Sequence, residues 1–168
     1  CTHLWQHYAY NNDLEYLRNI AFPVMQSTCK YWFDRLKENK DGKLVAPDEW
    51  SPEQGPWEDG VAYAQQLVWQ LFNETLHAVE ALKKVDIQID NVFVSELADK
   101  FRKLDNGVSV GSWGQIKEWK EDKGKLDFQG NDHRHLSQLI ALYPGNQISY
   151  HRDTLLADAA KVTLQSRG

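Results

Sequence analysis

Apolar residues recur at helical spacing in two long segments of the chain. Between residues 64 and 82 they stand three or four positions apart, the spacing that places side chains on one face of an α-helix. The same spacing returns between residues 89 and 104. The pattern therefore predicts two amphipathic helices, over residues 64–82 and 89–104.

The first 36 residues follow a rougher helical period. Apolar positions fall on this period from the start, so we expect the helix to extend upstream of residue 1 and the chain to be a fragment. Asp13 has the chemistry of a helix N-cap, and apolar residues continue the period after it. Pro23 has no backbone N–H for a helix to use, so the helix should end or kink near Phe22.

Polar loops separate the predicted helices. Residues 43–60 hold three of the five prolines and two of the ten glycines without any period, which indicates an ordered functional loop. Residues 115–119 favour a strand or a buried turn, and residues 121–135 form another polar loop. A short apolar stretch (136–142), a turn (143–146) and a last helix (153–167) with Gly168 as its C-cap complete the chain.

Helices joined by elaborate loops predict an all-α fold. The helices share no repeat of about 33 to 47 residues, which excludes the common solenoid motifs. The pattern fits a helical toroid with an active site at one rim. It fits a plain bundle with long loops almost as well.

Charge and composition narrow the choice of function. The 19 Lys and Arg against 24 Asp and Glu give a net charge of −5, which offers no basic surface for nucleic acid or an anionic membrane. No apolar run reaches the roughly 18 to 20 residues of a membrane helix. Cys1 and Cys29 lack CxxC spacing, and the sequence contains no phosphate-binding glycine loop. We therefore expect neither a nucleic-acid nor a membrane partner, and no cofactor.

Glu53 is the candidate general acid. Pro52 stiffens the backbone beside it, and Trp50 and Trp57 could shield the carboxyl group from water. Such a setting disfavours the charged form of a carboxyl group, as a general acid at neutral pH requires. The alternative interpretation is a solvated loop carboxylate beside a proline turn, which is the commoner situation for a loop Glu.

A second cluster consists of His133, Arg134 and His135. On a loop, all three side chains can converge on a ligand and donate hydrogen bonds to hydroxyl groups. Asp132 nearby raises the possibility of a metal, but no further ligands stand at a recognisable spacing, so we expect no metal site.

Five segments of the chain form a recognisable set: HLWQHY (3–8), SPEQGP (51–56), GVAYAQQLVWQLF (60–72), HRHLS (133–137) and LYPGNQI (142–148). Together they resemble glycoside hydrolase family 95, the inverting 1,2-α-L-fucosidases. The resemblance extends over essentially the whole chain, although the chain would cover only a central slice of the catalytic domain.

The resemblance implies an (α/α)6 barrel of twelve helices with long active-site loops, of which residues 1–168 would form roughly half, truncated at both ends. Glu53 would be the general acid, Arg134 and His135 would hold fucose hydroxyls, Trp5 would form part of the sugar-binding wall, and His133 is a weaker assignment. The substrate would be a fucosylated oligosaccharide or glycoconjugate, cleaved without metal or cofactor at a terminal α-1,2-linked L-fucose on galactose. A bacterial enzyme, extracellular or at the cell surface, is expected.

The family's water-activating groups are an upstream Asn-x-Asn pair and a downstream Asp, both outside this chain. We therefore expect the isolated chain to be inactive, to need the rest of the barrel from flanking sequence, and to dimerise or aggregate alone. Gln6 stands where Glu is common in the family, and Ala64 where an acidic residue usually follows the Tyr. If those acids orient the general acid or the sugar, we expect a different substrate preference.

Three alternatives stay open. An α-L-galactosidase is the nearest enzyme, because a pocket for a methyl group only weakly rejects an added hydroxyl. A non-catalytic helical module could bind glycan through Trp5, Trp50, Trp57 and Arg134. The third is a helical scaffold without a site.

Overall fold

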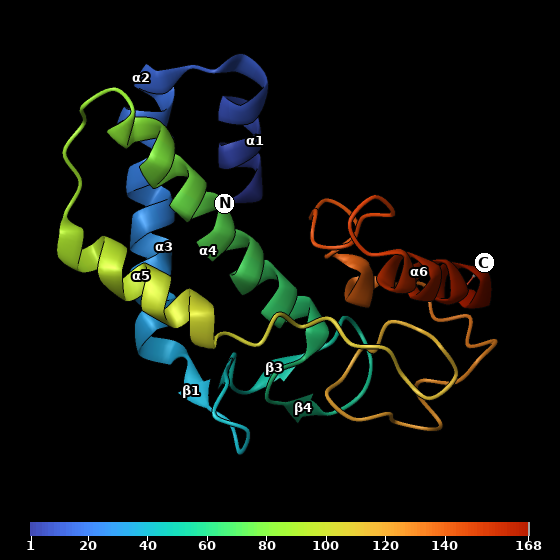
Figure 1. Cartoon of the computed structure of the whole chain (residues 1–168). Helices are drawn as coiled ribbons and strands as arrows, with labels where there is room; N and C mark the ends of the chain where they lie inside the picture. The colour runs from blue at the N-terminus through green and yellow to red at the C-terminus, as the bar shows by residue number, and fades with distance from the viewer. Residues whose placement is uncertain (168) are drawn as a thin grey trace. The chain divides into compact units, whose positions relative to one another are not determined.

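The computed structural model describes residues 1–167 and is mostly helical (Figure 1). Its helices are α1 (Thr2–Asn11), α2 (Leu14–Tyr16), η1 (Leu17–Ala21), α3 (Phe22–Arg35), α4 (Ala62–Lys83), α5 (Asn91–Lys103), η2 (Ser137–Leu139) and α6 (Thr154–Arg167). Its strands are β1 (Lys37–Glu38), β2 (Leu44–Val45), β3 (Glu49–Trp50) and β4 (Trp57–Glu58). The predicted helices over residues 64–82, 89–104 and 153–167 are confirmed as α4, α5 and α6. The C-cap expected at Gly168 lies outside the described residues.

The two-residue strands are the departure from an all-α fold. A pair of residues is too short to produce an alternating pattern of apolar and polar positions, so no sequence pattern predicts these strands. Strand β3 pairs antiparallel with β4, with Glu49 opposite Glu58 and Trp50 opposite Trp57. Among the described helices, none is both long and apolar enough to span a lipid bilayer.

The chain divides into two compact units. The first contains residues 1–44 and 68–104, and the second contains the described residues 45–67 and 105–167. Helix α4 begins in the second unit and continues in the first.

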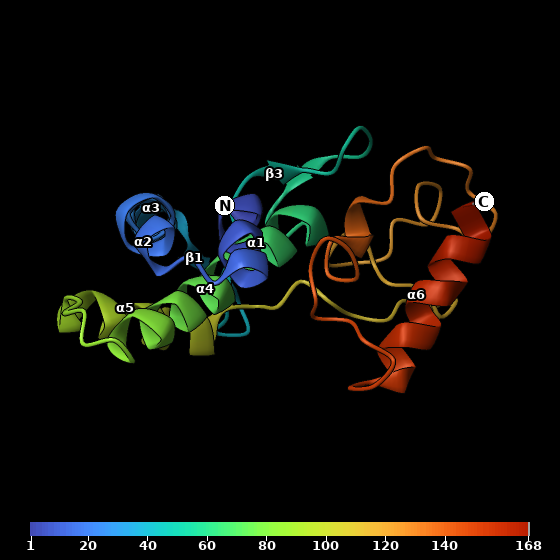
Figure 2. The ribbon, with the colours of Figure 1, turned by 90° about the horizontal axis from the view of Figure 1, so that it is seen from above.

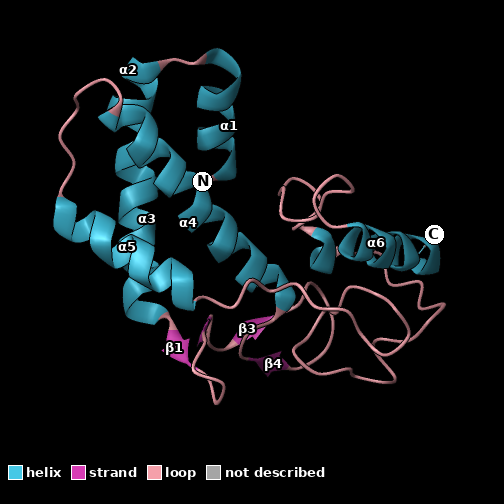
Figure 3. Cartoon of the chain, in the orientation of Figure 1, coloured by secondary structure: helices cyan, strands magenta, loops and turns pink. Residues whose placement is uncertain are grey.

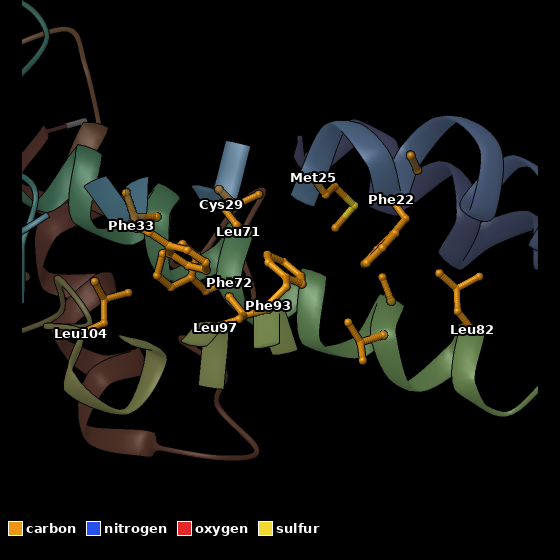
Figure 4. Close-up of a cluster of buried hydrophobic side chains, with 14 of the residues drawn as sticks. Phe22, Met25, Cys29, Phe33, Leu71, Phe72, Leu82, Phe93, Leu97 and Leu104 are labelled. Carbon is orange, nitrogen blue, oxygen red and sulfur yellow. The ribbon is translucent and has the colours of Figure 1, made fainter. Parts of the chain in front are cut away.

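The first unit is built on packing between helices α3, α4 and α5. Figure 4 shows their apolar side chains pointing toward one another. Phe33 of α3 meets Phe72 of α4 edge to face, with ring centroids 5.6 Å apart, and lies 5.8 Å from Phe93 of α5. The residues that form this buried cluster recur at helical spacing, so the amphipathic pattern of the sequence specifies the core of this unit directly.

Local signals at the helix ends act as predicted. The Asp13 side chain accepts a hydrogen bond of 2.9 Å from the backbone N–H of Tyr16 and caps α2. The helix is interrupted just before Pro23, where the wider turn η1 precedes α3. This confirms the interruption expected near Phe22, since proline cannot donate to the carbonyl one turn earlier and a wider turn relieves the clash.

The second unit is dominated by loops. Helix α6 belongs to this unit, and Figures 2 and 3 show irregular chain over most of the sequence between α5 and α6. Its apolar cluster is small and includes Ile116, Leu139, Ala159 and Ala160. The segment 115–119 forms a buried irregular turn rather than a strand, with one isolated bridge from Ile116 to Val110.

Two buried glutamines at the start of α4 hold these loops. Gln65 accepts from the backbone N–H of Ala46 at 2.9 Å and donates to the carbonyl of Asp105 at 2.6 Å. Gln66 donates to the carbonyls of Gly107 and Gln138 and accepts from the N–H of Ala141 at 2.7 Å. The first turn of α4 thus supplies the hydrogen bonds that buried loop backbone requires.

Candidate active site

Glu53 lies in the tight connection between β3 and β4. The indole rings of Trp50 and Trp57 stack across this pair of strands with centroids 6.1 Å apart, and Trp50 Nε1 donates to the carbonyl of Gly55 at 2.8 Å. Gly55 has a φ of 78°, and a Cβ there would lie 2.4 Å from the indole of the buried Trp119. Only glycine fits at this position, so the connection that carries Glu53 is tightly specified.

The Glu53 carboxylate meets both Arg134 and His135. The Arg134 guanidinium forms an ion pair with Glu53 Oε2, and His135 Nε2 lies 3.4 Å from the same oxygen. Arg134 Nε also donates to His135 Nε2 at 3.3 Å. The side chains of Glu53 and Arg134 remain 48% and 70% exposed. The structure therefore brings three of the predicted site residues together on an accessible surface.

The enclosure that we predicted for Glu53 is not formed by this chain. Trp50 and Trp57 stack on each other, and Trp57 remains 65% exposed. The cross-strand pairing of β3 with β4 explains this, because it places the two indoles face to face.

His133 links the two loops of the site. Its Nε2 lies 3.1 Å from the carbonyl oxygen of Pro52, to which an N–H at that atom donates. Its ring meets that of His135 edge to face, at 5.5 Å between centroids. His133 therefore touches the backbone next to Glu53 rather than the Glu53 carboxylate.

Trp5 belongs to the first unit. Its indole lies 5.3 Å from the ring of Tyr8 and 6.0 Å from that of His77. These three residues line a cavity of about 400 Å³. A role for Trp5 in holding sugar stays a prediction.

Glu118, which no sequence motif singled out, lies at the centre of the hydrogen bonds behind the site. Its side chain is 0% exposed and forms an ion pair of 2.9 Å with Arg167, whose side chain is 4% exposed. The one signal in the sequence is that Lys117 and Glu118 stand between the apolar Ile116 and Trp119, which the structure buries. A buried charge is expected to be paired, but the sequence does not reveal its partner.

Charged groups around Glu118 affect one another. Burial raises the pKa of Asp127, and the negative charges of Glu118 and Asp122 act in the same direction. A hydrogen bond from Gln115 at 3.1 Å and the charge of Arg167 oppose this rise.

Among residues 1–167, no group of three or more His, Cys, Asp and Glu side chains is arranged to hold a metal ion.

Glu53, Arg134 and His135 together present hydrogen-bond acceptors and donors on exposed loops, the groups that can bind hydroxyls. The chain belongs to glycosyl hydrolase family 95, because residues 1–168 match the catalytic domain of that family.

Curated relatives carry related descriptions. The chain is 37% identical to "Probable alpha-fucosidase A" of Aspergillus niger, over 99% of this chain and 21% of the relative. It is 28% identical to "Alpha-L-fucosidase 2" of Arabidopsis thaliana, over 100% of this chain and 20% of the relative. It is 27% identical to "Kojibiose hydrolase" of Flavobacterium johnsoniae, over 62% of this chain and 15% of the relative. The chain thus spans about a fifth of the length of the two fucosidases. Since these relatives come from a fungus, a plant and a bacterium, the bacterial source stays a prediction.

Proposed function

We propose that these residues are part of an α-L-fucosidase in which Glu53 is the general acid. The enzyme removes terminal α-1,2-linked L-fucose from galactose-ended glycans with inversion, outside the cell or at its surface. The observation that carries the proposal is the contact of the Glu53 carboxylate with Arg134 and His135 on an accessible surface. Membership of family 95 and the fucosidase descriptions of two relatives support the choice of substrate.

In this mechanism, Glu53 gives its proton to the glycosidic oxygen as the bond to the sugar breaks. An inverting enzyme also needs a base that activates water on the opposite face of the ring, with the two groups about 6.5 to 9.5 Å apart. We propose that residues outside this chain supply the base. The isolated chain should then bind sugar weakly at most and not turn it over.

Arg134 has two states in the proposed cycle. In the structure its guanidinium is paired with the Glu53 carboxylate, whereas a general acid must carry a proton. We propose that the fucose hydroxyls take over the donors of Arg134 when the substrate binds. Glu53 then loses its cationic partner and can hold a proton beside the leaving oxygen.

We also propose that the chain forms part of an (α/α)6 barrel, as a single domain that needs the flanking sequence for completion. Val92 on α5 and Leu155 on α6 are exposed apolar side chains, as expected for helices that further helices would cover.

The test of the acid uses the complete gene product that contains these residues. Glu53→Gln should lower kcat about a thousandfold on an α-1,2-fucosyl disaccharide, whose leaving group needs a proton. The loss should be much smaller on α-L-fucosyl fluoride, whose leaving group needs less help. Glu121→Gln, which changes an exposed carboxylate in the same unit, is the matched control and should leave both rates unchanged. An unchanged rate in Glu53→Gln would remove Glu53 as the acid.

Two further measurements separate the alternatives. Proton NMR of the first product formed should show β-L-fucose if the enzyme inverts. Comparing the aryl α-L-fucoside with the aryl α-L-galactoside distinguishes fucosidase from galactosidase. A complete gene product that binds fucosylated glycan but cleaves neither would instead support the glycan-binding module.

A further inference from the structure

The buried Glu118 carboxylate contacts both loops of the candidate active site. It accepts hydrogen bonds from Ser51 Oγ at 2.5 Å and from Gln54 Nε2 at 3.0 Å. These two residues lie on either side of Glu53 in the sequence. The carboxylate therefore fixes both ends of the short segment that carries the proposed acid.

The same carboxylate also holds the segment that carries Arg134 and His135. Ser137 Oγ donates to Glu118 Oε1 at 3.3 Å. Arg167, paired with Glu118 through Nη2, donates from Nη1 to the carbonyl of His133 at 3.2 Å. One end of the Arg134–His135 segment is thus bonded to the Glu118 carboxylate directly, through Ser137, and the other end is bonded to it through Arg167.

A buried ion pair of this kind is a poor source of stability. Removing two charges from water costs about as much as their attraction returns, and apolar replacements of similar size are often as stable. The pair does restrict the relative orientation of the two side chains, because a planar guanidinium and a carboxylate bind each other in only a few geometries. An ion pair of this geometry can set the distance between the loop that carries Glu53 and the loop that carries Arg134 and His135.

We propose that Glu118 and Arg167 are positioning residues that set the spacing of Glu53 from Arg134 and His135. The proposal rests on the proposed function and adds to it the origin of the site geometry. A displacement of about 1 Å in such a site can lower the rate about a hundredfold. Glu118 and Arg167 would control the rate without touching the sugar.

Two variants of the complete gene product test the proposal. Ser51→Ala removes the hydrogen bonds that join Ser51 Oγ to Glu118 and to Ser137 Oγ, and leaves no charge unpaired. Glu118→Gln with Arg167→Met removes the ion pair from both sides, and so avoids the buried single charge that could prevent folding. Thermal unfolding confirms that each variant is folded before its kinetics are read.

We expect Ser51→Ala to lower kcat on the fucosyl disaccharide about tenfold, with KM and the rate on fucosyl fluoride changed less than about twofold. The double variant should lower kcat up to about a hundredfold and also raise KM, because Arg134 and His135 lose their support as well. A control matched for burial is Thr75→Val in the first unit, where Thr75 Oγ1 donates to the carbonyl of Leu71. It should lower the melting temperature and leave both rates unchanged.

A cycle with Glu53→Gln separates positioning from general damage. If Glu118 acts through Glu53, Ser51→Ala should cost nothing further once Glu53 is Gln. An equal loss in both backgrounds, or an equal loss on both substrates, would overturn the positioning role while the acid assignment stands. If Glu53→Gln alone loses no rate, the acid assignment itself fails and the positioning role fails with it.

Discussion

The first unit buries a continuous cluster of apolar side chains and few polar ones, whereas the second buries many amide, hydroxyl and carboxyl groups beside a smaller apolar cluster. Most of the buried polar side chains among residues 1–167 belong to the second unit: Ser51, Gln65, Gln66, Gln115, Glu118, Asp127, Ser137, Gln138 and Thr163. Apolar packing tolerates small adjustments, while hydrogen bonds require each donor to meet its acceptor. The unit that carries the proposed acid is thus the one whose geometry is more narrowly defined.

The largest loss of stability is expected from a substitution in the apolar core of the first unit. Phe72→Ala in α4 should lower the free energy of unfolding by about 4 kcal/mol, because a fully buried ring is replaced by a cavity. Urea titration followed by tryptophan fluorescence measures this loss. Tyr10→Ala, at an exposed ring on α1, should change the stability by less than about 0.5 kcal/mol. Similar losses in both variants would show that the cluster is not the main support of the unit.

In the second unit, a more apolar residue should do harm. Gln66→Leu keeps the size of the side chain but leaves two carbonyls and the N–H of Ala141 without their partner. We expect a loss of about 3 kcal/mol in the same titration, since unsatisfied buried groups cost about 1 to 3 kcal/mol each and part of the loop can relax. Gln129→Leu, at an exposed position of this unit, is the control. Greater stability in Gln66→Leu would contradict the contrast between the units.

The same contrast explains what the sequence could predict. Helices α4 and α5 were predictable because their buried residues follow a period, and the cap at Asp13 because its partner lies three positions away. The links from Glu118 to Ser51 and Arg167 join distant positions through single hydrogen bonds, which leave no period in the sequence.

For the candidate site, the sequence predicts the residues but not the contacts between them. Glu53, Arg134 and His135 could be named from loop chemistry and family resemblance. Their contact, and the stacking of Trp50 on Trp57 instead of over Glu53, depend on the strand pair and on Glu118. Neither is visible in local sequence.

One buried carboxyl group in the first unit makes stability depend on pH. Burial raises the pKa of Glu74 from 4.5 to about 7, against a hydrogen bond from Gln70 Nε2. The folded state thus keeps the proton that the unfolded state releases above pH 4.5. Stability from this group is complete below that pH and is lost as the pH rises toward 7.

Between pH 5 and pH 7, Glu74 should lower the free energy of unfolding by about 2 kcal/mol. Urea titrations at the two pH values measure the change. Glu74→Gln carries no titrating group there, so its profile should be flatter by that amount. Parallel profiles for the two proteins would show that Glu74 keeps an ordinary pKa.

The smallest expected effects come from helix caps, and these should not differ between the units. Asp90 caps α5 in the first unit by accepting from Val92 N–H at 2.9 Å, and Asp153 accepts from Leu156 N–H at 3.1 Å at the start of α6 in the second. Asp90→Ala and Asp153→Ala should each cost about 1 kcal/mol, while Asp→Asn at either site keeps the acceptor and should cost less. Amide hydrogen exchange in the first turns of α5 and α6 measures both. A cap acts within one turn, so equal losses in stability at the two sites would mean that the contrast between the units comes from long-range hydrogen bonds and packing. A much larger loss for Asp153→Ala would mean instead that the contrast comes from the local stability of α6.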